Sequence, residues 1–395
     1  MEASTSPTTT FRTKKVMQFA GTMVGTLIGS GFASGQEVMQ FFTSYGLNGI
    51  IGSLVTMVLF GILGAVLMNF GYQFKHSKKL DPFKFFCGKY FGAFFEWFTI
   101  LFCFLVTVIM ISGGGATLNQ YFGVPNMIGN IIVATASVIV ALLGLRKLVN
   151  VLGSIGPVAI IFLILIALIA FIINIDNLFL ADQAIANAGD SVVRGIGDSN
   201  NWWLVAAVMY VAYNIVAGIP FLSLLGTEAA SKKEAIAGGI AGGALLGLCA
   251  VFLNLAMLST YADISQVEVP ALQFAQLISP VVGFVFVIVL LIMIFNTIVP
   301  MLVSIANQFA KPQLSITKHR AVIVAIAVVA LIVGQLPFSV LVNTIYPFVG
   351  YFGVLFMVLV LSKYIYWAAT GKDGYAEAKR EHEHALSAIQ AQSEN

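Results

Sequence analysis

Ten apolar segments, most of them long enough to cross a lipid bilayer, dominate this sequence of 395 residues. Hydrophobic residues make up 59% of the chain and charged residues only 9%, whereas roughly a quarter of a soluble domain is charged. Lipid must therefore serve as the solvent for most of this surface. We predict an all-α polytopic membrane protein with about ten transmembrane helices. The expected spans are 16–42, 49–72, 92–113, 127–145, 149–173, 202–225, 235–258, 280–308, 321–335 and 339–367.

The placement of basic residues predicts the orientation of the chain. Nineteen of the twenty Lys and Arg residues lie on one side, namely in the tails, in connections that follow even-numbered spans or, for Lys363, near the end of the last span, and only Arg194 lies on the other side. Under the positive-inside rule, both termini are in the cytosol and the protein lies in the cytoplasmic membrane. The net charge of +3 is too small to favour a nucleic-acid partner.

These spans divide the chain into five expected regions. They are a disordered cytosolic tail (1–15), a first five-helix repeat (16–173), an extracellular loop (174–201), a second five-helix repeat (202–367) and a cytosolic tail helix (368–395). The loop can hold a short helix, and residues 268–279 predict a surface or re-entrant helix before the eighth span.

The first span contains a sequence that is unsuited to the interior of a helix. Gly29-Ser30-Gly31 combines two glycines with a serine in mid-membrane. Unpaired backbone is tolerated there only where it lines a cavity or binds a ligand. Gly21 and Gly25 precede it at intervals of four residues, a pattern that favours close helix packing. We therefore predict an unwound binding segment at Gly29–Gly31, in preference to a flexible, glycine-packed helix.

The sixth span offers a counterpart to this break. Asn214, Gly218 and Pro220 lie near its centre, and proline removes a backbone donor. Five spans separate the two helices, so they run in opposite directions. Paired interrupted helices in two inverted halves indicate the binding site of a secondary transporter. The pattern predicts a five-plus-five inverted repeat with broken first and sixth helices.

Two motifs add a family resemblance. Ile28-Gly29-Ser30-Gly31-Phe32 resembles the first-helix break of the amino acid–polyamine–organocation (APC) superfamily, and Gly226–Lys233 resembles its segment entering the seventh helix. Residues 25–37 are similar to the YkvI-like predicted amino-acid permeases. The length and the ten-helix layout match over almost the whole chain. The resemblance implies the leucine-transporter fold and alternating-access transport of an amino acid or a related amine.

The resemblance also implies roles for individual residues. The amides of Ser30, Gly31 and Phe32, next to Gly29, would hold a substrate carboxylate. Tyr213, Asn214 and Gly218 would line the opposite wall, and Ser112 and Gly113 would face the same cavity. A sodium ion would be held by the carbonyls of Gly25 and Ile28 together with Asn296 and Thr297. Because the fifth span has no lysine to replace the ion, sodium coupling is favoured.

Glu37 lies just beyond the break, and an acid within a membrane span is a functional-site hypothesis by default. It could bind a substrate ammonium, carry a coupling proton or act as an outer gate, and a purely structural role stays open. Proton coupling through Glu37 is therefore the alternative to sodium. Glu96 and Glu228 are expected to form structural ion pairs with nearby lysines.

Two other classes of function are alternatives to a transporter of a small molecule. A receptor of the same fold would bind an amino acid without moving it. An enzyme is disfavoured because the spans contain no histidine cluster, nucleophile elbow or paired carboxylates. No cofactor is expected beyond a coupling sodium ion, and the only other predicted partner is the lipid bilayer.

Overall fold

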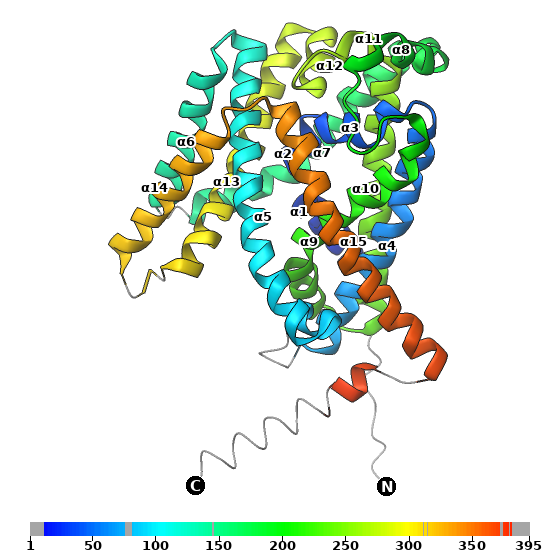
Figure 1. Cartoon of the computed structure of the whole chain (residues 1–395), viewed down its shortest axis with the longest axis vertical. Coiled ribbons are helices and arrows are strands. Elements are labelled where there is room, and N and C mark those ends of the chain that lie inside the picture. Colours follow the sequence, from blue (N-terminus) through cyan, green and yellow to red (C-terminus); the bar gives the residue numbers. More distant parts are fainter. Residues whose placement is uncertain are drawn as a thin grey trace.

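The computed structural model describes residues 12–75, 81–143, 146–310, 312–313, 315–371, 374–378 and 380, with the backbone alone for 146–157 and 368. All regular structure in these ranges is helical, which confirms the all-α class (Figure 1). The α-helices are α1 (Thr13–Leu27), α2 (Ser30–Ala33), α3 (Gln36–Phe41), α4 (Asn48–Gln73), α5 (Pro82–Phe122), α6 (Asn126–Leu142), α7 (Arg146–Ile173), α8 (Ala181–Ala188), α9 (Trp203–Thr227), α10 (Lys232–Ser259), α11 (Tyr261–Ile264), α12 (Pro270–Ile278), α13 (Pro280–Phe309), α14 (Ile316–Val333) and α15 (Phe338–Thr370). Four short 3₁₀ helices accompany them: η1 (Thr43–Tyr45), η2 (Ile175–Leu180), η3 (Gly189–Ser191) and η4 (Asn200–Trp202).

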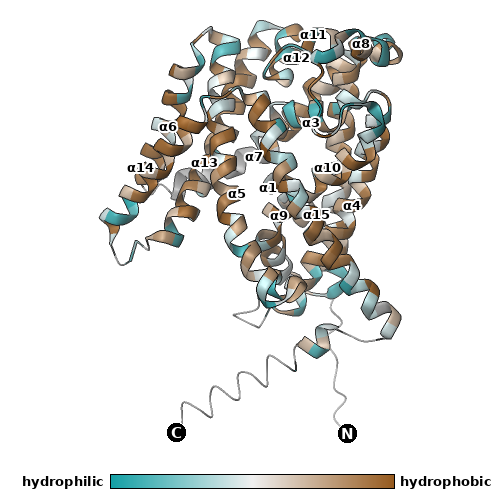
Figure 2. Cartoon of the chain, viewed as in Figure 1, coloured by the Kyte–Doolittle hydropathy of each residue, from teal (hydrophilic) through white to brown (hydrophobic). Residues whose placement is uncertain are grey.

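Seven of these helices are long and apolar enough to cross a membrane by themselves: α4, α5, α9, α10, α13, α14 and α15. The described end of α7 and the segment after it form a further candidate span that is bent by 80°. Most of the bundle is brown in Figure 2, the colour of hydrophobic residues. The protein is therefore polytopic. The count of ten remains a prediction because α6 has only 17 residues and the first span is divided.

The short helices expected outside the spans are present as α8 and α12. The predicted tails lie largely outside the described residues, which begin at Arg12 and reach only Arg380 in the tail helix.

Charged groups separate toward the two ends of the bundle. At the end where α1 begins, Lys15 pairs with Glu228 and Lys84 with Glu96, both at 2.9 Å, as predicted. At the opposite end, the Arg194 guanidinium donates to backbone oxygens of residues 44 and 198. We call these the terminal end and the distal end. The separation follows the predicted charge pattern, and the orientation in a membrane stays a prediction.

Small residues bring α4 and α10 into close contact. A Cβ atom on Gly243 would lie 2.2 Å from the Gly61 nitrogen, and one on Gly239 would lie 2.3 Å from the Gly64 carbonyl carbon. Glycine is therefore required where these backbones meet, as in other membrane helix interfaces.

The first span is broken twice. It leaves helical geometry at Ile28 and Gly29, which have extended backbones, before the short α2. It turns again at Gly35, whose φ of 87° favours glycine, and continues as α3. The predicted break of the first helix is confirmed, and it begins one residue before the Gly-Ser-Gly sequence.

The predicted break of the sixth helix is wrong. Helix α9 runs without interruption from Trp203 to Thr227, with Pro220 inside it. The Asn214 side chain donates to the Tyr210 carbonyl within the helix, at 2.9 Å. A Cβ atom on Gly218 would lie 2.8 Å from Leu27, so this glycine admits α1 instead of unwinding α9. Pro220 removes only one backbone hydrogen-bond donor from α9, and packing against the surrounding helices keeps the helix continuous across it.

Candidate binding site at the break in the first span

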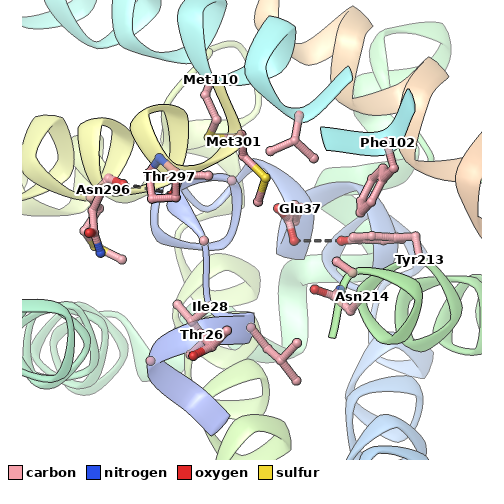
Figure 3. Close-up of a pocket in the computed structure, with 18 of the residues that line it drawn as sticks. Thr26, Ile28, Glu37, Phe102, Met110, Tyr213, Asn214, Asn296, Thr297 and Met301 are labelled. Carbon is pink, nitrogen blue, oxygen red and sulfur yellow. Dashed lines mark hydrogen bonds between the residues drawn. The ribbon is translucent and has the colours of Figure 1, made fainter. Parts of the chain in front are cut away.

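A cavity of about 660 Å³ lies beside the break (Figure 3). Its walls come from the first span and from α5, α9, α13 and α15, five elements that are far apart in the sequence. Five of the predicted substrate-binding and gating residues border the cavity: Gly29, Gly31, Glu37, Tyr213 and Asn214. The structure therefore brings the centre of the predicted site together around one space.

The cavity extends along one face of α1 toward the terminal end. Gln18, Thr22 and Thr26 are exposed, line the cavity and recur every four residues. A Cβ atom on Gly21 or Gly25 would meet nothing within 4 Å in the described part of the chain. Both glycines line the cavity, so among the described residues no side chain packs against this face, and close packing of Gly21 and Gly25 stays a prediction.

Glu37 lies at the other end of this cavity, where it is only 5% exposed. Its Oε2 atom accepts a hydrogen bond of 2.7 Å from the Tyr213 hydroxyl. The Tyr346 ring stacks on Tyr213 with centroids 4.4 Å apart, and its hydroxyl faces the same carboxylate. A Cβ atom on Gly31 would lie 2.0 Å from Glu37 Oε1. These four residues, Gly31, Glu37, Tyr213 and Tyr346, form what we call the Glu37 cluster.

The charge of the cavity is one-sided. Among the described residues that line it, none is Lys, Arg or His, and Glu37 is the only acid. In a poorly solvated space, an ionised Glu37 attracts a cation and repels a second carboxylate. A substrate carboxylate therefore cannot bind at Gly31 while the Glu37 carboxylate rests there.

The break also releases backbone groups toward this space. The Gly29 amide donates to the Leu27 carbonyl at 3.1 Å, so the Gly25 carbonyl loses the partner it would have in a continuous helix. Ile28 lies outside the regular helix. Asn296 and Thr297 border the cavity from α13, on the side away from Glu37 and Tyr213 (Figure 3). All four predicted sodium ligands thus line one cavity, and their coordination of an ion remains a prediction.

Several predicted site residues lie outside the cavity lining. Ser30 and Phe32 are buried, and the Ser30 hydroxyl bonds to the Met110 sulfur. Gly218, as described above, packs against α1 and is also outside the lining.

Ser112 and Gly113 do not face the cavity as predicted. The Ser112 hydroxyl donates to the Leu336 carbonyl at 2.8 Å, and the Phe338 ring covers Gly113. Because a helix turns about 100° per residue, Ser112 lies on the face of α5 opposite Met110, which does border the cavity.

Sequence reasoning missed Phe102, Met110 and Tyr346 among the lining residues. An aromatic or methionine residue within an apolar span is indistinguishable from core by composition. The one usable signal was at Tyr346, a hydroxyl group followed by Pro347 inside the last span.

No family model matches the sequence. The chain is 29% identical over 348 residues to the uncharacterized membrane protein YkvI of Bacillus subtilis (strain 168), covering 88% of this chain and 95% of YkvI. It is 24% identical over 349 residues to the uncharacterized protein YyaD of the same organism, covering 86% and 94% of the two chains.

Among solved structures, it is similar to a mutant of the Eremococcus coleocola manganese transporter, with a TM-score of 0.49 and 15% identity over 92% of this chain and 80% of that chain. The same transporter in complex with an aromatic bis-isothiourea compound gives a TM-score of 0.48 and 16% identity over 88% and 76%. The chain is thus an all-α polytopic membrane protein that is similar to YkvI over most of both sequences.

Proposed function

We propose that this protein is a secondary active transporter of a small substrate that carries an ammonium group, namely an amino acid or a related amine. The single observation that carries the proposal is the Glu37 cluster, a buried carboxylate at the head of a cavity whose described lining contains no basic residue. An ammonium group supplies the missing positive charge and three donors, and Glu37 and the Tyr213 hydroxyl supply acceptors.

The geometry refines the predicted mode of binding. Because Glu37 rests against Gly31, an amine can bind the carboxylate directly. A zwitterion reaches the amides of Ser30, Gly31 and Phe32 only after Glu37 has moved away from Gly31. Simple amines and amino acids should therefore differ in how strongly they depend on this movement.

Alternating access is supported by the contrast between the two ends. The cavity extends to exposed residues at the terminal end. On the distal side of the break, the Ala271 amide donates to the Ser34 carbonyl at 2.9 Å, and Gln120 forms two hydrogen bonds with the Val269 backbone. These contacts join α12 to the first span and to α5. Opening at the distal end would require them to break.

Two coupling ions remain in competition. Gly25, Ile28, Asn296 and Thr297 offer the hard oxygen ligands that suit sodium. A proton would instead use Glu37, the only acid among the described lining residues. We favour sodium because it leaves Glu37 free to bind the substrate.

The decisive experiment is uptake into proteoliposomes of a pooled library of amino acids and amines, under imposed sodium or proton gradients. Concentrative uptake with a sodium gradient, lost in Glu37→Gln, is the expected result. Glu228→Gln is the matched control because Glu228 is exposed and forms only a surface ion pair. Undiminished uptake by Glu37→Gln would refute the proposed role of Glu37. Uptake driven by protons in the absence of sodium would overturn the sodium proposal, and binding without flux would favour a receptor.

A further inference from the structure

A second cavity of about 160 Å³ lies at the distal end, between α3, the region of η3, the chain around α11 and the start of α15. Gln36, Gln40, Glu268 and Ser339 are among the residues that line it, and it shares none of its described lining with the larger cavity. It therefore cannot be explained as part of the site already described.

Two amide oxygens in this cavity lack a partner. Gln36 is 3% exposed and Gln40 is 0% exposed, and neither Oε1 atom has a hydrogen-bond partner within the described part of the chain. The Gln40 Nε2 atom donates to the Ser339 carbonyl at 2.9 Å, which holds this amide in place. A buried carbonyl oxygen without a hydrogen-bond donor costs free energy. Both oxygens are therefore expected to bind a hydrogen-bond donor or a cation.

A carboxylate completes the oxygen set. Glu268 accepts hydrogen bonds from the Ser339 amide at 2.8 Å and from its hydroxyl at 3.1 Å. It forms no ion pair with any described residue within 4.0 Å, and no basic residue is among the described residues that line the cavity. The guanidinium of Arg194, which follows the lining residue Val193 in the chain, bonds to Asn200 and to backbone oxygens. The cavity therefore carries an uncompensated negative charge when Glu268 is ionised.

The three side chains converge on one place. Gln36 and Gln40 are four residues apart on α3, so they share a face of that helix. Gln40 and Glu268 both hydrogen-bond to Ser339 at the start of α15. Oxygen donors with a single negative charge suit a hard monovalent cation, whereas a divalent ion favours more carboxylates.

We propose that this distal cavity binds a small monovalent cation, either a metal ion such as sodium or a compact ammonium, through Gln36, Gln40 and Glu268. The ligands belong to α3 and to a segment that is bonded to α15, so the bound cation joins elements at the closed distal end. The proposal does not rest on the transport function, because it concerns different residues and a binding measurement alone tests it.

The test is hydrogen–deuterium exchange of the full-length protein in nanodiscs, in sodium chloride, in methylammonium chloride and in N-methylglucamine chloride at equal ionic strength. N-Methylglucamine is a bulky cation and serves as the reference. We expect sodium or methylammonium to slow exchange in peptides covering 36–44 and 261–269, because binding stabilises the bound state. Whichever cation protects these peptides identifies the ligand.

Three variants locate the effect. Gln36→Leu should weaken the apparent cation affinity by about tenfold or more, and Gln36→Glu should strengthen it by adding a charge. Glu268→Gln retains an acceptor for Ser339 but removes the charge, so it should weaken binding without a loss of fold. Thr297→Val separates the two proposed cation sites, since Thr297 lines only the other cavity, and it should leave the protection of these peptides in place.

The proposal is overturned if neither small cation protects these peptides beyond N-methylglucamine, or if Gln36→Glu and Glu268→Gln leave the affinity unchanged. Protection that is lost in Thr297→Val, and retained in the Gln36 variants, would also overturn it.

Discussion

Replacing Gly31 with alanine tests whether this glycine exists to admit the Glu37 carboxylate. The new methyl group would lie 2.0 Å from Glu37 Oε1 and 2.9 Å from the Tyr346 hydroxyl. Because ordinary contacts begin at about 3.5 Å, the carboxylate oxygen must retreat by roughly 1.5 Å. Because the Glu37 Cδ atom would also lie only 3.0 Å from the new methyl group, the whole carboxylate must shift, which breaks the 2.7 Å hydrogen bond that the Tyr213 hydroxyl donates to Oε2.

The magnitude follows from the bond that is lost. A hydrogen bond to a charged group contributes about 1.5–3 kcal/mol to stability. Gly31→Ala and Tyr213→Phe should each lower the free energy of unfolding by about this amount. Since both remove the same bond, the double variant should cost little more than the larger single effect. The coupling energy of this cycle should therefore be about 1.5–3 kcal/mol.

The assay is reversible unfolding in mixed detergent micelles, with the free energy of unfolding measured for the wild type, both single variants and the double variant. Gly25→Ala and Gly29→Ala are the matched controls, because a Cβ atom there meets no atom of the described residues within 4 Å. Neither control should lower the free energy of unfolding by more than about 0.5 kcal/mol, and Gly25→Ala should raise it by up to about 1 kcal/mol because Gly25 lies inside helix α1. Additive effects of Gly31→Ala and Tyr213→Phe, or an equally large loss in either control, would refute the reasoning.

Three further predictions concern other parts of the protein. Thr297→Val should raise the sodium concentration for half-maximal uptake by about tenfold or more, and an unchanged sodium titration would remove Thr297 from the proposed ion site. Burial and the neighbouring Glu96 carboxylate raise the pKa of Asp81 from 3.8 to about 6. The folded state therefore binds this proton more tightly than the unfolded state, and the stability of the protein should fall as pH rises from about 4 to 6. The thermal unfolding midpoint of Asp81→Asn should lack this decline. The same dependence of the midpoint on pH in Asp81→Asn and in the wild type would show that Asp81 is not its source. Arg12→Met should lower the thermal unfolding midpoint more than Lys15→Met, because Arg12 pairs with the fully buried Glu234 whereas the partner of Lys15 is 59% exposed. Equal midpoints would show that the buried pair contributes no more than the surface pair.

Local properties of the sequence predicted much of the architecture. Long apolar segments predicted helices in lipid because backbone groups must be paired inside a segment there. Gly29-Ser30-Gly31 predicted the break because two glycines weaken any helix, whatever surrounds it. The ion pairs of Glu96 and Glu228 were also predictable, since acids at helix ends beside lysine-rich connections find partners nearby.

Contacts between distant elements decided the rest. Pro220 and Gly218 weaken a helix locally, yet α9 stays continuous because its neighbours hold it and Gly218 receives Leu27. Gly21 and Gly25 have the spacing of a packing face, but their face borders a cavity. No periodicity within one helix can show whether a neighbouring helix is present or absent.

The Glu37 cluster shows the same division most clearly. The sequence by itself determined that an acid, Glu37, follows a break in a membrane span. Only the tertiary structure placed Tyr213 and Tyr346 beside that acid, since the two tyrosines come from α9 and α15 and are 133 residues apart. It also explained why residue 31 is a glycine. The group that leaves no room for a side chain there is the Glu37 carboxylate, six residues further along the chain, beyond the left-handed Gly35.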